Sequence, residues 1–75
     1  MGWRTRIAAD PAVMVGKPVI KGTWITVEFV IDLLSGGWSH EDLLQDYPGL
    51  TEDDILACLE YAHEMIKGIR GLPVA

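Results

Sequence analysis

Three side chains in the 75-residue sequence could bind a soft metal ion: His40, Cys58 and His63. A zinc site needs four ligands, or three ligands and a water molecule, at a recognisable spacing. Cys58 and His63 are five residues apart, whereas residues that share one face of a helix are three or four apart. We therefore predict no metal site, and we interpret the three residues as two surface histidines and one small packed hydrophobe.

The acidic run at residues 52–54 could in principle supply paired carboxylates for acid–base catalysis. Such catalysis needs an apolar pocket that keeps one carboxyl protonated, and the flanking sequence indicates none. The two histidines also allow no convincing Ser-His-Asp or Cys-His arrangement. We expect a protein that is not an enzyme and that uses no cofactor.

The stretch GKPVIKGTWITV, residues 16–27, has the glycines and lysines of a phosphate-binding loop. In that loop the lysine follows the second glycine and the backbone N–H groups cradle the phosphate. Here Lys17 follows the first glycine, and Pro18 has no N–H. The β-branched residues and the turn at residues 21–23 instead predict a β-arm or hairpin, with residues 13–15 as the possible partner of residues 19–21.

Charge divides the chain into two unlike parts. Residues 1–25 carry four bases and one acid, whereas the remaining residues carry two bases and ten acids. An anionic partner would therefore meet the first part and a cationic partner the second. The candidate contacts to nucleic acid or another anion are Arg4, Arg6, Lys17 and Lys21.

Beyond residue 26 the apolar spacing predicts three helices. Thr26 is the expected N-cap of a helix over 27–35, Ser39 begins a short one that ends near Asp46, and Thr51 begins a third that runs to about Lys67. The predicted fold is mainly α: a β-arm or hairpin (residues 1–25) and a three-helix, helix-turn-helix-like (homeodomain-like) bundle (residues 26–67), which form one domain. Residues 68–75 are expected to be a flexible tail.

Apolar residues exceed what the core of so short a chain can hide, because 49% of the residues are hydrophobic. The third helix shows one stripe at 55, 59, 62 and 66 and a second at 58, 61 and 65, although half-exposed Tyr61 and Met65 would also explain the second. We expect a homo-oligomer, a dimer or higher. The candidate interface residues are Trp24, Phe29, Leu33, Cys58, Tyr61 and Met65.

Cysteine content and hydropathy indicate the compartment. Cys58 is the only cysteine and cannot form a disulfide within the chain, which favours a reducing environment. No apolar stretch approaches the roughly 18 residues of a membrane span. We expect a cytoplasmic protein that has no contact with a membrane.

The segment ADPAVMVGKPVIKGTWITVEFVIDLLSGGWSHEDLLQDYPGLTEDDILACLEYA resembles the domain of unknown function 433 family of small prokaryotic proteins. The resemblance implies a helix-turn-helix-like fold and an antitoxin role, in which the protein binds and blocks a PIN-like ribonuclease toxin and represses its own operon. The family usually has arginine where this chain has Trp24, which favours an apolar interface at that position, although Trp24 could equally pack on its own hairpin.

Two alternatives to the antitoxin role remain open. One is a DNA-binding regulator. In it the four N-terminal bases would bind operator DNA, because the exposed acids of the third helix would repel phosphate. The other is a structural oligomer whose partner is unknown.

Overall fold

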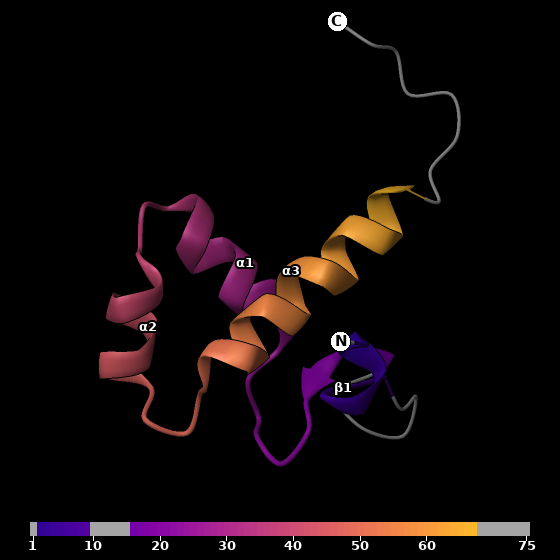
Figure 1. The fold of residues 1–75 in the computed structure, drawn as a ribbon, viewed down its shortest axis with the longest axis horizontal. Coiled ribbons are helices and arrows are strands. Elements are labelled where there is room, and N and C mark those ends of the chain that lie inside the picture. Colours follow the sequence, from indigo (N-terminus) through magenta and orange to yellow (C-terminus); the bar gives the residue numbers. More distant parts are fainter. Residues whose placement is uncertain (1, 10–15, 68–75) are drawn as a thin grey trace, which may run out of the picture.

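The computed structural model describes residues 2–9 and 16–67. A 3₁₀ turn, η1 (Trp3–Thr5), leads into strand β1 (Ile7–Ala8), and strand β2 (Val19–Ile20) precedes the helices. The helices are α1 (Val27–Ser35), α2 (His40–Asp46) and α3 (Glu52–Lys67), as Figure 1 shows. The fold is mainly helical, with a short antiparallel hairpin at its N-terminal end, and this confirms the predicted fold class.

Each helix begins where its capping residue predicts. The Thr26 hydroxyl accepts a hydrogen bond from the N–H of Phe29 at 3.0 Å, which fixes the start of α1. Ser39 and Asp42 form a reciprocal capping box at the start of α2, with distances of 3.0 and 2.9 Å. Gly37 has a φ of 100°, a left-handed conformation that lets the chain turn sharply between these two helices.

The N-terminal hairpin differs from its prediction in one strand. Ile7 pairs with Ile20 and Ala8 with Val19, so the partner of β2 is the segment that follows η1. Residues 13–15, which we expected as the partner, lie outside the described residues, as does the expected tail at 68–75. After β2 the chain turns back on itself, because Ile20 donates its N–H to the carbonyl of Ile25 at 2.9 Å.

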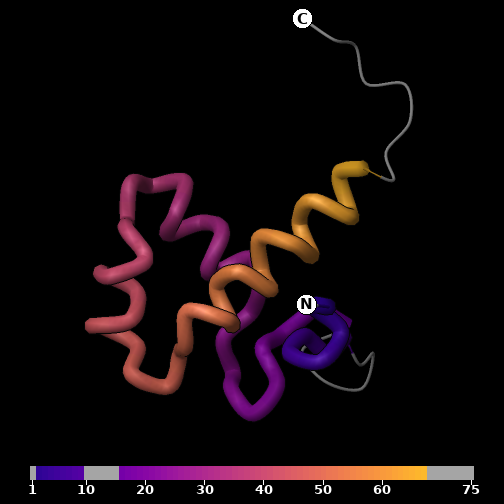
Figure 2. The backbone as a smooth tube through the Cα atoms, viewed as in Figure 1, coloured from indigo at the N-terminus to yellow at the C-terminus, as the bar shows by residue number. Residues whose placement is uncertain are grey.

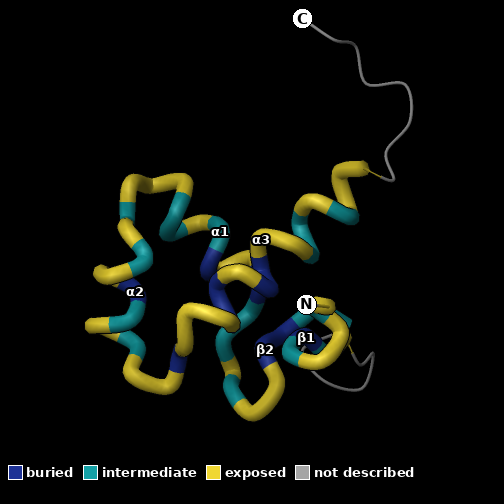
Figure 3. The backbone as a smooth tube through the Cα atoms, viewed as in Figure 1, coloured by how far each residue is buried: buried dark blue, intermediate teal, exposed yellow. Residues whose placement is uncertain are grey.

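The core lies where the hairpin and the three helices meet (Figure 3). Its most deeply buried side chains come from β2 and from all three helices: Ile20, Val30, Leu43, Ile55 and Cys58. The N-terminal arm, formed by η1 and β1, packs against α3 of the same chain. Figure 2 shows the beginning of the chain beside that helix. The two strands of this hairpin pair with each other within one chain.

The apolar surface of α3 divides differently from the two predicted stripes. Ile55 and Cys58 face the core, whereas Leu59, Met65 and Ile66 are exposed. Each predicted stripe thus combined inward and outward residues. The reason is that the second half of α3 projects beyond the other two helices (Figure 1), so residues there lose the neighbours that cover the first half.

None of the helices in the described part of the chain has the length and apolar character needed to cross a membrane.

Candidate interaction surfaces

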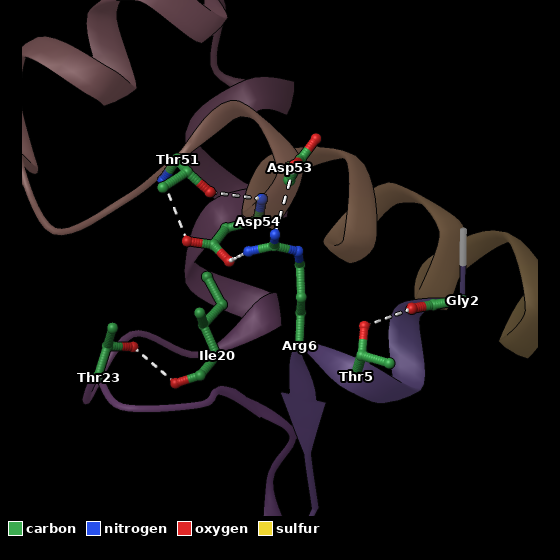
Figure 4. Close-up of polar contacts among 8 residues, drawn as sticks. All are labelled: Gly2, Thr5, Arg6, Ile20, Thr23, Thr51, Asp53 and Asp54. Atoms are coloured by element: carbon green, nitrogen blue, oxygen red, sulfur yellow. Dashed lines mark hydrogen bonds and ion pairs between the residues drawn. The ribbon is translucent and has the colours of Figure 1, made fainter.

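The N-terminal arm is fixed to α3 by an ion-pair network that the sequence analysis did not foresee (Figure 4). The Arg6 guanidinium lies 3.1 Å from Asp54 and 3.3 Å from Asp53. Asp54 is a buried acid, 6% exposed, so its charge needs a close partner. Arg6 provides that partner, and it is therefore not free to bind a phosphate.

Asp54 also caps the helix on which it lies. Its second carboxylate oxygen accepts the N–H of Thr51 at 3.0 Å, and the Thr51 hydroxyl accepts the N–H of Asp54 at 3.1 Å. This is the reciprocal capping box that the sequence predicts at Thr51. One buried carboxylate thus joins the helix start to the N-terminal arm.

A second set of contacts holds the first residues of the arm against the middle of α3. Trp3 donates its backbone N–H to Glu60 at 2.7 Å and its indole N–H to Glu64. Its ring meets Tyr61 edge to face, with centroids 4.8 Å apart. Arg4 lies 4.5 Å from the centre of the Trp3 ring and 3.9 Å from Glu64. Trp3 is a positioning residue that the sequence analysis missed, because no motif connects residue 3 with a helix 57 residues later.

The two remaining N-terminal bases also have neighbours within the chain. Lys17 lies 3.1 Å from Glu28, and Lys21 donates to the backbone carbonyl of Arg4 at 3.1 Å. Both are exposed, as is Arg4. The structure therefore brings Arg4, Arg6 and Lys21 to one end of the molecule, where Arg6 is engaged in its ion pairs with α3. Fewer N-terminal bases are therefore available to bind an anion than the four that the sequence predicted.

The acids of α3 also have partners within the chain. Besides Asp54, four of them have a described partner: Glu52 with His40 at 2.7 Å, Asp53 with Arg6, and Glu60 and Glu64 with the N-terminal arm. Among the described residues, five acids have no basic partner: Asp32, Glu41, Asp42 and Asp46 of α1 and α2, and Glu60 of α3, which accepts only the backbone N–H of Trp3. Within the acidic part of the chain, most of the acids without a basic partner therefore lie on α1 and α2.

The three soft ligands do not come together. Within residues 2–9 and 16–67, no group of three histidine, cysteine or acidic side chains could hold a metal ion. Burial, together with the nearby Asp54 carboxylate, raises the pKa of the Cys58 thiol from 9.0 to about 12. Cys58 is therefore a protonated core side chain, and we correct its assignment as an interface residue, since it is fully buried in the core.

The other interface candidates differ in exposure. Trp24 is 79% exposed at the turn between β2 and α1, and Met65 is 48% exposed on the projecting half of α3. Phe29 is 38% exposed and meets Tyr47 edge to face. Leu33 and Tyr61 are half-buried against the core. Trp24 does not pack on its own hairpin.

An outward apolar face on α3 was only partly recognised in the sequence. Leu56, Leu59 and Ile66 are 42%, 39% and 59% exposed, and their separations of three and seven residues place them along one side of the helix. The predicted stripes did not include Leu56, and they grouped Leu59 and Ile66 with Ile55, which is buried. The sequence does indicate this outward face, because apolar residues at 56, 59 and 66 have the spacing of a surface along which two helices pack.

The fold and these surfaces define a small three-helix protein that has an N-terminal β-arm and an exposed apolar face. A family model described as "Protein of unknown function (DUF433)" matches residues 7–62, and the chain belongs to that family. It is similar to the crystal structure of a DUF433 member protein from Anabaena variabilis ATCC 29413, with 31% sequence identity and a TM-score of 0.77. The similarity covers 83% of this chain and 61% of the cyanobacterial one, so this chain spans less than two thirds of that protein's length. A search of curated proteins gave no match.

Proposed function

We propose that this protein is a non-enzymatic interaction module, the antitoxin of a type II toxin–antitoxin pair, which binds and inhibits a PIN-like ribonuclease toxin. The observation that carries the proposal is the uneven pairing of charge. Three acids of α3 pair with arginines of the N-terminal arm, whereas four acids of α1 and α2 have no basic partner among the described residues. A surface of this kind attracts a basic protein and speeds its encounter with the chain.

The outward face of α3 supports a second element of the proposal, self-association. Leu56, Leu59 and Ile66 would remain in water in a monomer, and burying them removes that cost at about 25 cal/mol per Å² of apolar area. We propose that two copies join through this face. Such a dimer would present two acidic α1–α2 surfaces, one from each copy, and would leave both open to a toxin.

Co-expression with the product of the neighbouring gene tests the antitoxin role, which requires that product to be a ribonuclease. The ribonuclease should co-purify with this chain and should lose its activity on RNA in the complex. Asp32→Asn combined with Glu41→Gln should weaken the complex and make it more sensitive to salt. Gln45→Ser, an exposed neutral change on α2, is the matched control. A ribonuclease that stays fully active, or the absence of any complex at low salt, would refute the role.

Light scattering during gel filtration tests the self-association separately. The chain should elute as a dimer, and Leu59→Ser combined with Ile66→Ser should shift it to a monomer without loss of helical circular dichroism. A monomeric wild type at 100 μM would exclude the dimer.

DNA binding is the second candidate, and a specific observation favours it. Arg4, Lys17 and Lys21 are exposed, and dimerisation would bring two such sets of bases together. A gel shift on DNA upstream of the gene should show binding that salt abolishes and that Lys17→Ala with Lys21→Ala weakens. No shift at low salt would reject this function while leaving toxin binding untouched.

A further inference from the structure

The outward side of α3 has the residue spacing of a contact between two helices. Leu56, Leu59, His63 and Ile66 are exposed and follow one another at intervals of three, four and three residues. Because each residue turns the helix by about 100°, this spacing keeps all four side chains on one side, as at the inward positions of a heptad. We call these four residues the α3 seam. His63 belongs to it because an imidazole has an apolar body and a polar edge.

The seam borders a small hollow between α3 and the N-terminal arm. Trp3, Leu56, Ala57 and Glu60 line this hollow, and its volume of about 30 Å³ has room for the end of one aliphatic side chain. The arm bounds the seam on this flank but does not cover it, since Leu56 remains 42% exposed. Figure 1 shows that the second half of α3 projects beyond the other helices, so the seam is accessible there as well.

Charge is unevenly distributed along the same helix. The first turn of α3 carries Glu52, Asp53 and Asp54, whereas Lys67 in the last turn is its only lysine or arginine. Lys67 is exposed and has no acidic partner among the described residues. Two parallel α3 helices would bring the acidic ends together and the two lysines together. Two antiparallel helices would instead bring Lys67 of each copy to the acidic end of the other, which is the complementary arrangement.

Antiparallel packing also gives every residue of the seam a different partner. A two-fold axis through the middle of the seam places Leu56 opposite Ile66 of the second copy and Leu59 opposite its His63, because the members of each pair are equally far from the axis. Ile66 of the second copy then lies at the hollow beside Leu56. In a parallel pair each residue would meet itself, and two His63 rings would face each other in the centre of the contact.

We propose that two copies of this chain pack their α3 seams against each other in antiparallel directions, with Lys67 of each copy beside Glu52 and Asp53 of the other. The inference rests on the self-association proposed above, and it adds the direction of the two helices and the residues that meet. One like-charge approach opposes this arrangement, because Glu60 lies near Glu60 of the second copy. That carboxylate already accepts the backbone N–H of Trp3.

The direction of the helices decides where the two N-terminal arms lie. In an antiparallel two-fold pair the same flank of both helices lies on one face of the dimer, whereas in a parallel pair the two flanks lie on opposite faces. The arm contacts the flank of α3 that carries Glu60 and Glu64. Both arms, with the exposed bases Arg4 and Lys21, therefore lie on the same face of the proposed dimer.

Cysteine cross-linking tests the direction. Leu56→Cys and Ile66→Cys chains are oxidised separately and as a mixture, while the buried Cys58 thiol, with its pKa raised to about 12, stays unreactive. The mixture should give at least about fivefold more disulfide-linked dimer than either variant alone. In the antiparallel pair residue 56 lies about 15 Å along the axis from residue 56 of the second copy, by the rise of the helix, and a disulfide spans at most about 7 Å between Cα atoms.

Charge reversal is an independent test of the same arrangement. Lys67→Glu should raise the Kd of the dimer at least about fivefold, and adding Glu52→Lys should recover at least half of that loss, because the reversed charges again lie side by side. Lys17→Glu makes the same charge change outside α3 and is the matched control, expected to alter the Kd less than about twofold. Light scattering at several concentrations gives these constants.

The outcomes separate this inference from the proposals on which it depends. Efficient cross-linking of Leu56→Cys with itself, a dimer that gives no cross-link in the mixture, or no recovery by Glu52→Lys would overturn the antiparallel arrangement and leave self-association in place. A wild type that stays monomeric in light scattering would remove self-association and this inference together. Neither result bears on co-purification with a ribonuclease, which decides the antitoxin role.

Discussion

Arg6 and Asp54 lie 3.1 Å apart and join the N-terminal arm to the first turn of α3, across 48 residues of sequence. Asp54 is buried and simultaneously accepts the N–H of Thr51, so both of its oxygens are occupied. A buried carboxylate with two partners is stabilised only while both remain. The arm is therefore held to the bundle by a charge that would be costly to expose.

Replacing Arg6 by alanine should lower the free energy of unfolding by about 1–3 kcal/mol, because Asp54 would keep its burial and lose its cation. Asp54→Ala should cost at least as much, since it also removes the helix cap. Urea denaturation of the two variants and of the double variant gives the coupling energy, which we expect to be about 1–2 kcal/mol.

Arg4→Ala is the matched control for that cycle. Its side chain is 74% exposed and its guanidinium lies 3.9 Å from Glu64, so its removal should cost no more than about 0.5 kcal/mol. If Arg4→Ala and Arg6→Ala were equally destabilising, the buried position of Asp54 would not be what makes Arg6 important.

Helix capping gives a second prediction. Thr26→Ala and Ser39→Ala should each lower the free energy of unfolding by about 1 kcal/mol, because each removes the oxygen that accepts an N–H at a helix start. Ser35→Ala is the control: its hydroxyl donates to carbonyls near the end of α1, so it caps no helix start. Denaturant midpoints measure all three. Unchanged midpoints for both cap variants would contradict the capping geometry.

The helices could be predicted almost to the residue because the signals that define them are local. Thr26, Ser39 and Thr51 each fix a helix start through an atom three residues away, and the glycines at 36 and 37 end α1. The periodicity of apolar residues then supplied the lengths. Local sequence therefore carries most of the information about this fold.

The surfaces could not be predicted in the same way because they depend on contacts between distant segments. Nothing near Arg6 indicates Asp54, and nothing near Trp3 indicates Tyr61. These contacts decide which charges are neutralised, so the sequence could not show which acids of the helical part lack a basic partner. The same cause made Cys58 resemble a surface residue, since periodicity gives the face of a helix but not its neighbour.

The Cys58 thiol gives a prediction about pH. Its pKa is about 12 in the folded protein and 9.0 when unperturbed, so between these values the unfolded chain loses a proton that the folded chain keeps. The free energy of unfolding should therefore fall as pH rises above about 9, by up to about 1.4 kcal/mol per pH unit from this group. Below pH 9 the contribution is fully present.

Denaturation of the wild type and of Cys58→Ala between pH 8 and pH 11 isolates that contribution, because other groups titrate alike in both. The difference in free energy of unfolding between them should shrink as pH rises. In the folded wild type at pH 8 the thiol should also react with a disulfide reagent only as fast as the protein opens. Rapid labelling in the folded state would be incompatible with a buried, protonated thiol.

Substitution of two tryptophans distinguishes a residue that stabilises the fold from a residue that is exposed for association. Trp24 is 79% exposed, so Trp24→Ser should change the free energy of unfolding by no more than about 0.5 kcal/mol. Trp3 donates to Glu60 and packs against Tyr61, so Trp3→Ser should cost about 1–3 kcal/mol. In association with the proposed ribonuclease or the proposed second copy, the order should reverse: Trp24→Ser should weaken binding at least tenfold, as loss of an exposed aromatic anchor does. Urea denaturation and calorimetric titration give the two quantities for each variant. If Trp24→Ser left every association unchanged, Trp24 would not be part of an interface, and the exposed apolar side chains of α3 would have to account for assembly alone.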